Sequence, residues 1–191
     1  MRKIFGRPFS LFYRLKRIIA FPVSIIHAKF SPVSYAKKMG VRMKGKVTIY
    51  GSSYEMFSSE PFLVTLHDNI FISVGAKFIC HDGGVLPFRK DNPTLDLAAP
   101  IIVKSNCFIG AGAVVMKGVT IGENCIIAAH AVVTKNVPDG SIVGGNPAKL
   151  IKTTAEYIEQ AKRDSLGIGH ILGDAKLREY KRIFDIRADR K

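Results

Sequence analysis

The stretch IIVKSNCFIGAGAVVMKGVTIGENCIIAAHAVVTKNVP (101–138) repeats every six residues. One position of the repeat is always aliphatic, and the position four residues later is always small and apolar. The aliphatic set comprises Val103, Ile109, Val115, Ile121, Ile127 and Val133, and the small set comprises Cys107, Ala113, Val119, Cys125, Ala131 and Val137. Neither a helix nor a simple strand alternation has this period. A six-residue repeat is typical of a parallel β-helix.

The residue three positions after each aliphatic one belongs to a type enriched at positive φ. These corner residues are Asn106, Gly112, Gly118, Asn124, His130 and Asn136. The repeat therefore predicts a short strand with two inward side chains, followed by a sharp corner. Three such units close one triangular coil, and successive coils stack at about 4.8 Å. We expect Cys107 and Cys125, which are one coil apart, to stack in the core as unreactive thiols.

The pattern extends toward the N-terminus with two interruptions. Val41 and Val47 begin it, and a regular section follows with inward Leu66, Ile72 and Phe78 and corners at Asn69, Gly75 and His81. Residues 50–62 are irregular. Residues 82–100 (DGGVLPFRKDNPTLDLAAP) fit no repeat and predict a loop that projects from a corner. Loops of this length in a compact repeat are usually functional.

Positive charge is concentrated at the N-terminus. The 191-residue chain has a formal net charge of +14, yet residues 1–54 hold twelve Lys or Arg and no acid. We interpret residues 1–38 as a basic, amphipathic, helical arm that either binds a membrane surface or packs on the repeat. Its apolar run, 18–26, is too short to span a bilayer. A nucleic-acid partner is not expected, because no nucleic-acid motif accompanies the charge.

These features predict three parts: the arm (1–38), a β-helix domain (39–152) with the inserted loop 82–100, and two C-terminal helices (153–191). We expect the C-terminal helices to cover the open end of the repeat. Three cysteines do not support a disulfide framework, and no Cys/His cluster has zinc-ligand spacing, so we expect no metal.

His81 is the strongest candidate for acid–base chemistry, because it is the last ordered corner before the long loop. His130 also occupies a corner, where tolerance of positive φ is sufficient to explain it. Cys80 offers a competing nucleophile. Adjacent residues rarely reach the same atom, which disfavours a joint role for Cys80 and His81.

The run from Pro100 to Lys152 resembles the hexapeptide-repeat acyltransferases, above all the sugar and xenobiotic O-acetyltransferases. The segments SEPFLVTLHDNIFIS (59–73), FICHDGG (78–84) and PFRKDNPTLD (87–96) resemble the branch found in capsule, exopolysaccharide and lipopolysaccharide synthesis. The resemblance covers about residues 40–160. It implies a mainly β fold, a left-handed parallel β-helix, assembled as a homotrimer with active sites between subunits.

The resemblance also implies the chemistry. Acetyl-CoA would be the co-substrate, and His81 would act as general base on a sugar hydroxyl. An imidazole is suited to this task, because the usual pKa of histidine, about 6.5, lies close to neutral pH. The positions matched to CoA contacts are Ala111, Ala129, Thr134, Lys135, Lys149 and Lys152. The expected acceptor-site residues are Glu60, Phe88, Arg89 and Phe108, the last at a position where relatives often carry Trp, which this chain lacks. Glu60, Asp68 and Asp82 could orient His81, and we favour Glu60.

Other acceptors remain open: an amino-sugar nitrogen, serine or an antibiotic. A non-catalytic β-helix scaffold, with His81 as a mere corner residue, is an alternative of another class. We expect the protein to be cytoplasmic, with the arm placing it at the inner membrane face near lipid-linked sugars.

Overall fold

A computed structural model describes residues 22–186. The chain forms two compact units, Met1–Thr154 and Ala155–Lys191, and each is described by itself. Residues 1–21 of the predicted arm and residues 187–191 lie outside the described part.

In the described part of the first unit, residues 22–30 are helical and are here called the arm helix; the short helix α2 (Pro32–Lys38) follows. Strands of two to five residues follow: β1 (Arg42–Met43), β2 (Val47–Ile49), β3 (Val64–Leu66), β4 (Ile70–Ile72), β5 (Lys77–Ile79), β6 (Ile101–Val103), β7 (Cys107–Ile109), β8 (Val114–Met116), β9 (Thr120–Ile121), β10 (Ile126–Ile127), β11 (Val132–Val133), β12 (Ser141–Gly144) and β13 (Lys149–Thr153). Two 3₁₀ helices, η1 (Pro61–Leu63) and η2 (Gly83–Phe88), interrupt them.

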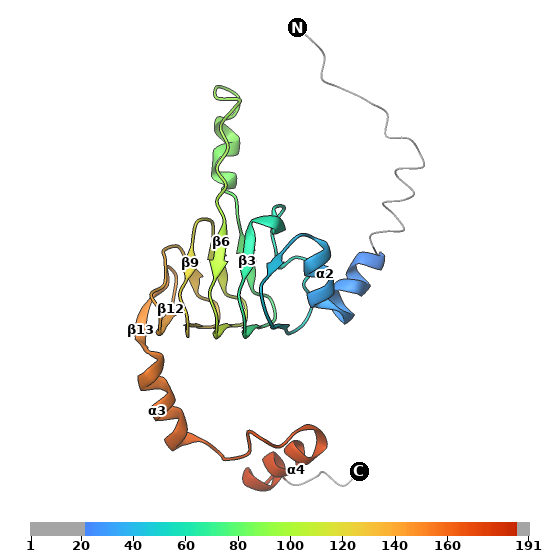
Figure 1. Ribbon diagram of the computed structural model, residues 1–191, viewed down its shortest axis with the longest axis vertical. Coiled ribbons are helices and arrows are strands. Elements are labelled where there is room, and N and C mark those ends of the chain that lie inside the picture. The colour runs from blue at the N-terminus through green and yellow to red at the C-terminus, as the bar shows by residue number, and fades with distance from the viewer. Residues whose placement is uncertain (1–21, 187–191) are drawn as a thin grey trace. The chain divides into compact units, whose positions relative to one another are not determined.

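The strands form three sheets that the chain visits in turn. Sheet 1 has the order β1-β3-β6-β9, sheet 2 the order β13-β12-β10-β7-β4-β2, and sheet 3 the order β11-β8-β5. The runs β3–β5, β6–β8 and β9–β11 each give one strand to every sheet. All strand pairs except β12–β13 are parallel. The chain is therefore a three-sided parallel β-helix (Figure 1). Its left-handed winding stays a prediction.

The strand register locates the interruptions of the repeat. Ile102 pairs with Thr120, 18 residues later, which is one regular coil. Thr65 pairs with Ile102, 37 residues later, so this coil holds 19 extra residues, and residues 82–100 project from the stack in Figure 1. Val47 pairs with Ile70, 23 residues later, so the coil that contains segment 50–62 holds five extra residues.

The inward positions agree with the prediction. All twelve residues of the two apolar sets in 101–138 are at most 5% exposed, and they form one core with Leu66, Ile72 and Phe78. Cys107 and Cys125 are both free and buried. The hydrogen bond with Cys125, together with burial, raises the pKa of the Cys107 thiol. The same contact lowers the pKa of the Cys125 thiol to about 7, whereas both thiols are buried and donate to backbone carbonyls. Their place in the core is confirmed, and their lack of reactivity stays a prediction.

Most predicted corners have positive φ, but two do not. Asn69, Gly75, Asn106, Gly112, Gly118, Asn124 and His130 have φ between 55° and 78°. The prediction was wrong for Asn136 and His81, which are not among the residues with positive φ. Asn136 lies in a coil shortened to 16 residues, where its Oδ1 accepts a hydrogen bond from Thr120 N. His81 instead continues in extended form into a bridge with Ala98.

The second unit contains α3 (Thr154–Asp164) and α4 (Gly173–Ile183). Both agree with the expected helices, and the rings of Tyr180 and Phe184 stack with centroids 6.5 Å apart. No described residue within either helix is buried. Whether these helices cover the end of the β-helix stays a prediction.

Candidate active site

His81 stands where the regular repeat gives way to the long loop. It follows β5 by two residues, at the edge where the chain leaves sheet 3 for sheet 1. An antiparallel bridge joins it to Ala98, and the flanking bonds Asp82 N to Leu97 O (2.9 Å) and Ala99 N to Cys80 O (2.9 Å) close the base of the loop. The loop base therefore fixes the backbone of His81, while its side chain stays 39% exposed.

Glu60 reaches His81 from the other interruption. It precedes η1 at the end of segment 50–62, and its Oε2 lies 2.8 Å from His81 Nδ1. Ser58 supports this carboxylate: its Oγ donates to Glu60 Oε2 (3.3 Å) and accepts from Cys80 N (3.2 Å). An Nδ1–H donated to Glu60 leaves Nε2 of His81 as the nitrogen that can accept a proton.

The other two carboxylates proposed to orient His81 are engaged elsewhere. Asp82 Oδ1 accepts from Gly84 N at 3.0 Å and so begins η2, while its Oδ2 lies 3.8 Å from Lys117 Nζ. Asp68 Oδ1 accepts a hydrogen bond at 2.6 Å from Lys46 N, which lies on the preceding coil. Of the three candidates, the structure brings Glu60 to the imidazole.

The loop residues differ in their roles. Arg89 is tied into the loop itself, because Nε donates to Leu95 O and Nη2 to Asp96 Oδ1, both at 2.8 Å. Phe88 is 61% exposed and presents its ring to the surroundings of the loop. Arg89 thus shapes the loop, whereas Phe88 is available for contact.

The predicted CoA corners stack along another edge, between sheets 2 and 3. His130 N donates to Ala111 O (2.8 Å), so the corner at Ala129 lies directly over the corner at Ala111. A Cβ added at Gly112 would lie 2.5 Å from the His130 ring, so a larger residue would require this ring to move, and the φ of 65° at Gly112 favours glycine. Phe108 lies on the outer face of sheet 2, paired with Phe71 and 41% exposed.

The basic positions gather at the C-terminal coils. Lys135 lines a groove of about 210 Å³ together with residues of β12 and β13, among them Leu150. Lys149 and Lys152 lie on β13, which pairs antiparallel with β12. Within one chain, Lys149, Lys152 and the corners at Ala111 and Ala129 lie on other edges or faces of the prism than His81. Thr134 and Lys135 follow β11 at the same edge as His81, between sheets 3 and 1, two coils further along the stack.

Comparisons with known proteins now bear on this geometry. The family "Bacterial transferase hexapeptide (six repeats)" matches residues 100–135, the most regular part of the β-helix. Protein CapG of Staphylococcus aureus is 43% identical over 121 residues, which cover 63% of this chain and 70% of that protein. The chain belongs to the bacterial hexapeptide-repeat transferases.

Two further proteins, one curated relative and one solved structure, are similar to this chain. The 2,3,4,5-tetrahydropyridine-2,6-dicarboxylate N-acetyltransferase of Staphylococcus carnosus is 40% identical over 77 residues, 40% of this chain and 32% of that protein. A hexapeptide-repeat-containing acetyltransferase of Vibrio cholerae superposes with a TM-score of 0.51 over 75% of this chain and 93% of that one, at 18% identity, and shows the fold alone. The transferase and acetyltransferase predictions are confirmed at the level of the family. Acetyl-CoA as the acyl donor stays a prediction.

Cysteine chemistry at the site is disfavoured in this transferase. Cys80 is fully buried, and burial raises the pKa of its thiol. A thiol that is neither exposed nor readily ionised is a poor nucleophile. Within residues 22–186, no group of three or more His, Cys, Asp or Glu side chains is placed to hold a metal ion.

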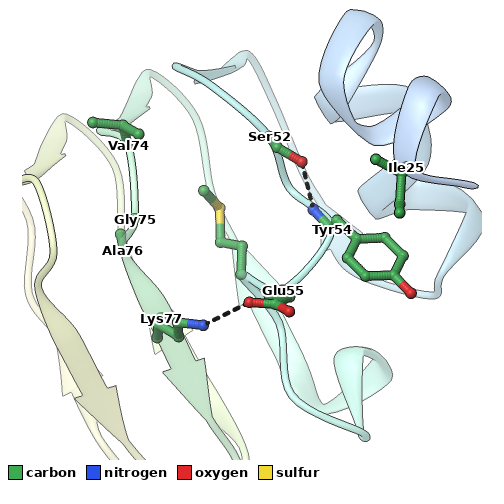
Figure 2. A pocket seen from close by; sticks show the side chains of 9 residues that line it. Ile25, Ser52, Tyr54, Glu55, Val74, Gly75, Ala76 and Lys77 are labelled. Atoms are coloured by element: carbon green, nitrogen blue, oxygen red, sulfur yellow. Dashed lines mark hydrogen bonds and ion pairs between the residues drawn. The ribbon is translucent and has the colours of Figure 1, made fainter.

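A separate pocket of about 430 Å³ lies between the arm helix and the first coils (Figure 2). Its lining comprises Ile25, Ser52, Tyr54, Glu55, Met56, Val74, Gly75, Ala76 and Lys77. None of the predicted site residues lines it. Glu55 and Lys77 pair across it at 3.4 Å.

Sequence reasoning identified His81 and favoured Glu60, but it missed two supporting groups. Ser58 holds the Glu60 carboxylate, and Ala98 bridges to His81. Ser58 lies in the irregular segment and Ala98 at the far end of the loop, so neither has a place in the six-residue count. The spacing of Ser58 and Glu60, two residues apart, was the signal in the sequence that could have predicted their contact.

Proposed function

We propose that this chain is an acetyl-CoA-dependent O-acetyltransferase that acetylates a sugar hydroxyl in surface-polysaccharide biosynthesis, with His81 as the general base. The 2.8 Å contact between Glu60 Oε2 and His81 Nδ1 carries this proposal. A carboxylate behind an imidazole fixes its tautomer and stabilises the imidazolium form. A residue that served only as a corner would need neither the carboxylate nor its supporting Ser58.

The proposed reaction requires one proton shuttle. His81 Nε2 accepts the proton of the acceptor hydroxyl, and the oxygen attacks the thioester carbonyl, which forms the new C–O bond. The C–S bond then breaks, and the leaving CoA sulfur takes the proton back from His81. A backbone N–H at a small-residue corner is suited to stabilise the oxyanion in between.

A complete site would need two copies of the chain. His81 lies at the edge between sheets 3 and 1, whereas Phe108 lies on the face of sheet 2 and Ala111 and Ala129 lie at the edge between sheets 2 and 3. We therefore propose a homotrimer of left-handed prisms. One subunit supplies His81, Glu60 and the loop with Phe88 and Arg89. The proposed CoA contacts are Ala111 and Ala129 at the edge between sheets 2 and 3, Thr134 and Lys135 at the edge between sheets 3 and 1, and Lys149 and Lys152 on β13.

An amine acceptor is the second candidate. The relative from Staphylococcus carnosus carries N-acetyltransferase in its name and is 40% identical over 77 residues. The match covers 32% of that protein's length. The same base and thioester chemistry serves either acceptor.

The decisive experiment compares the wild type with His81→Ala and a matched control, His67→Ala. His67 is a half-buried imidazole just after β3 and makes no part of the proposed site. We expect all three proteins to bind acetyl-CoA equally in calorimetry. Thioester cleavage in the presence of an acceptor should fall roughly 10²- to 10⁴-fold in His81→Ala alone.

A panel of acceptor compounds distinguishes O-acetylation of a sugar from acetylation of an amine. Neutral sugars, sugar nucleotides and lipid-linked sugars, the last available at the cytoplasmic face of the inner membrane, test O-acetylation. Amino sugars and amino acids test the alternative. Failure of the wild type to bind acetyl-CoA would support a scaffold, and full turnover by His81→Ala would remove His81 as the base.

A further inference from the structure

The arm helix has two apolar sides, of which one is fixed against the β-helix. Ala28 is completely buried, and Ile25 lines the pocket beside Tyr54 (Figure 2). Ser53 N donates to Ala28 O at 3.2 Å, which ties the helix to the first coil. The orientation of this helix is therefore set by its own packing.

The opposite side of the arm helix is apolar as well, yet no residue in 22–186 buries it. Val23, Ile26 and Phe30 are 60%, 57% and 76% exposed. Their spacing of three and four residues places them on one helical face, turned away from Ala28. Such a stripe on the outside of a fixed helix is unexplained by the packing of the described chain.

The charge around this stripe is of one sign. Lys29, Lys37 and Lys38 are exposed in the arm helix and α2, and Lys29 Nζ lies 5.9 Å from the centre of the Phe30 ring. The sequence of residues 1–54 holds twelve basic residues and no acid, with Glu55 as the first carboxylate. A second copy of the same face would bring like charges together, whereas an anionic surface complements them.

We propose that the face formed by Val23, Ile26 and Phe30 docks this protein on an anionic lipid bilayer. The three side chains would lie at the boundary of headgroups and acyl chains, with the lysines among anionic headgroups. The contact is peripheral: no helix among residues 22–186 is long and apolar enough to span a bilayer. A nucleic acid would pair its phosphates with the lysines, but it would leave the apolar stripe exposed to water. The docking is independent of the role of His81.

The test is co-sedimentation of the full-length protein with vesicles of phosphatidylglycerol and phosphatidylcholine. We expect binding that weakens with salt and is much reduced on phosphatidylcholine alone. The variant Val23→Ser/Ile26→Ser/Phe30→Ser should lose at least about tenfold in affinity. Replacing Lys29, Lys37 and Lys38 by Gln should cost roughly fivefold each.

The matched control is Leu177→Ser/Tyr180→Ser/Phe184→Ser, which removes three exposed apolar side chains of the second unit. It should bind vesicles as the wild type does. The variant Val23→Ser/Ile26→Ser/Phe30→Ser, here called the arm variant, should acetylate a water-soluble acceptor as fast as the wild type does. This result would separate the docking proposal from the catalytic one. Wild-type vesicle binding by the arm variant would overturn the proposal, because the charge alone would then explain it. A smaller oligomer in that variant, without loss of vesicle binding, would assign the face to a second copy and equally overturn it.

Discussion

The regular coils of residues 101–138 and the two insertions at 50–62 and 82–100 follow opposite rules. In the coils, the sequence position fixes whether a side chain is buried or at a corner, and all twelve predicted inward residues are buried. In the insertions, the six-residue count fails, yet these segments bring Glu60 and His81 within 2.8 Å. The repeat makes a regular prism, and the departures from it bring together the two proposed catalytic groups.

The largest effect should come from the core of a regular coil. Ile127 and Ile126 are neighbours on β10, but Ile127 is fully buried and Ile126 only half-buried. Ile127→Ala should lower the free energy of unfolding by about 2–5 kcal/mol, through lost burial and the cavity left behind. Ile126→Ala should cost clearly less, as measured by urea denaturation. Equal losses would show that the alternation along β10 does not set stability.

A second prediction concerns the insertions, where activity should change without stability. Glu60→Gln keeps the size of the side chain but removes the charge behind His81. We expect kcat to fall at least about tenfold, while acetyl-CoA binding and the unfolding midpoint stay unchanged. Asp68→Asn, on the next coil, is the matched control and should retain turnover. A Glu60→Gln variant with wild-type kcat would limit Glu60 to holding the backbone of segment 50–62.

The same contrast explains how far the sequence could predict the molecule. Burial and corners in 101–138 followed from residue types, because each coil repeats the geometry of its neighbour. The predicted positive φ was wrong at Asn136, because its coil has 16 residues instead of 18. It was wrong at His81, because this residue forms a bridge with Ala98 at the base of the loop. The Glu60–His81 contact depends on the five extra residues in the coil of segment 50–62, whose path no periodicity specifies.

The corner rule itself gives a third, smaller prediction. Asn124 has a φ of 55°, a conformation in which a Cβ clashes with the following carbonyl unless a short polar side chain compensates. Asn124→Ala should therefore cost about 1–2 kcal/mol in the free energy of unfolding. Asn124→Gly should cost much less, since glycine accepts positive φ. If both variants are equally destabilised, the side chain of Asn124 and not its backbone conformation is responsible.

The smallest predicted effect lies where the repeat ends, at Asp139 in the shortened coil. Its Oδ1 accepts from Glu123 N at 2.8 Å and lies 3.5 Å from Lys104 Nζ, so one carboxylate links three coils. The backbone hydrogen bond, with a lesser part from Lys104, lowers the pKa of Asp139. A carboxyl with a folded pKa below its unfolded value of about 3.9 stabilises the fold above that pH, and this contribution is lost as the pH falls through the folded pKa.

Asp139→Asn should therefore unfold at a slightly lower urea concentration than the wild type at pH 7. The difference between the two proteins should shrink as the pH is lowered and vanish once Asp139 is protonated in both states. Lys104→Gln should retain most of the wild-type pH dependence, because the Glu123 N–H is the larger cause. A difference that persists unchanged at pH 2 would mean that the two side chains differ in shape and packing at the shortened coil. The charge of Asp139 would then not be what holds the end of the repeat to the regular coils.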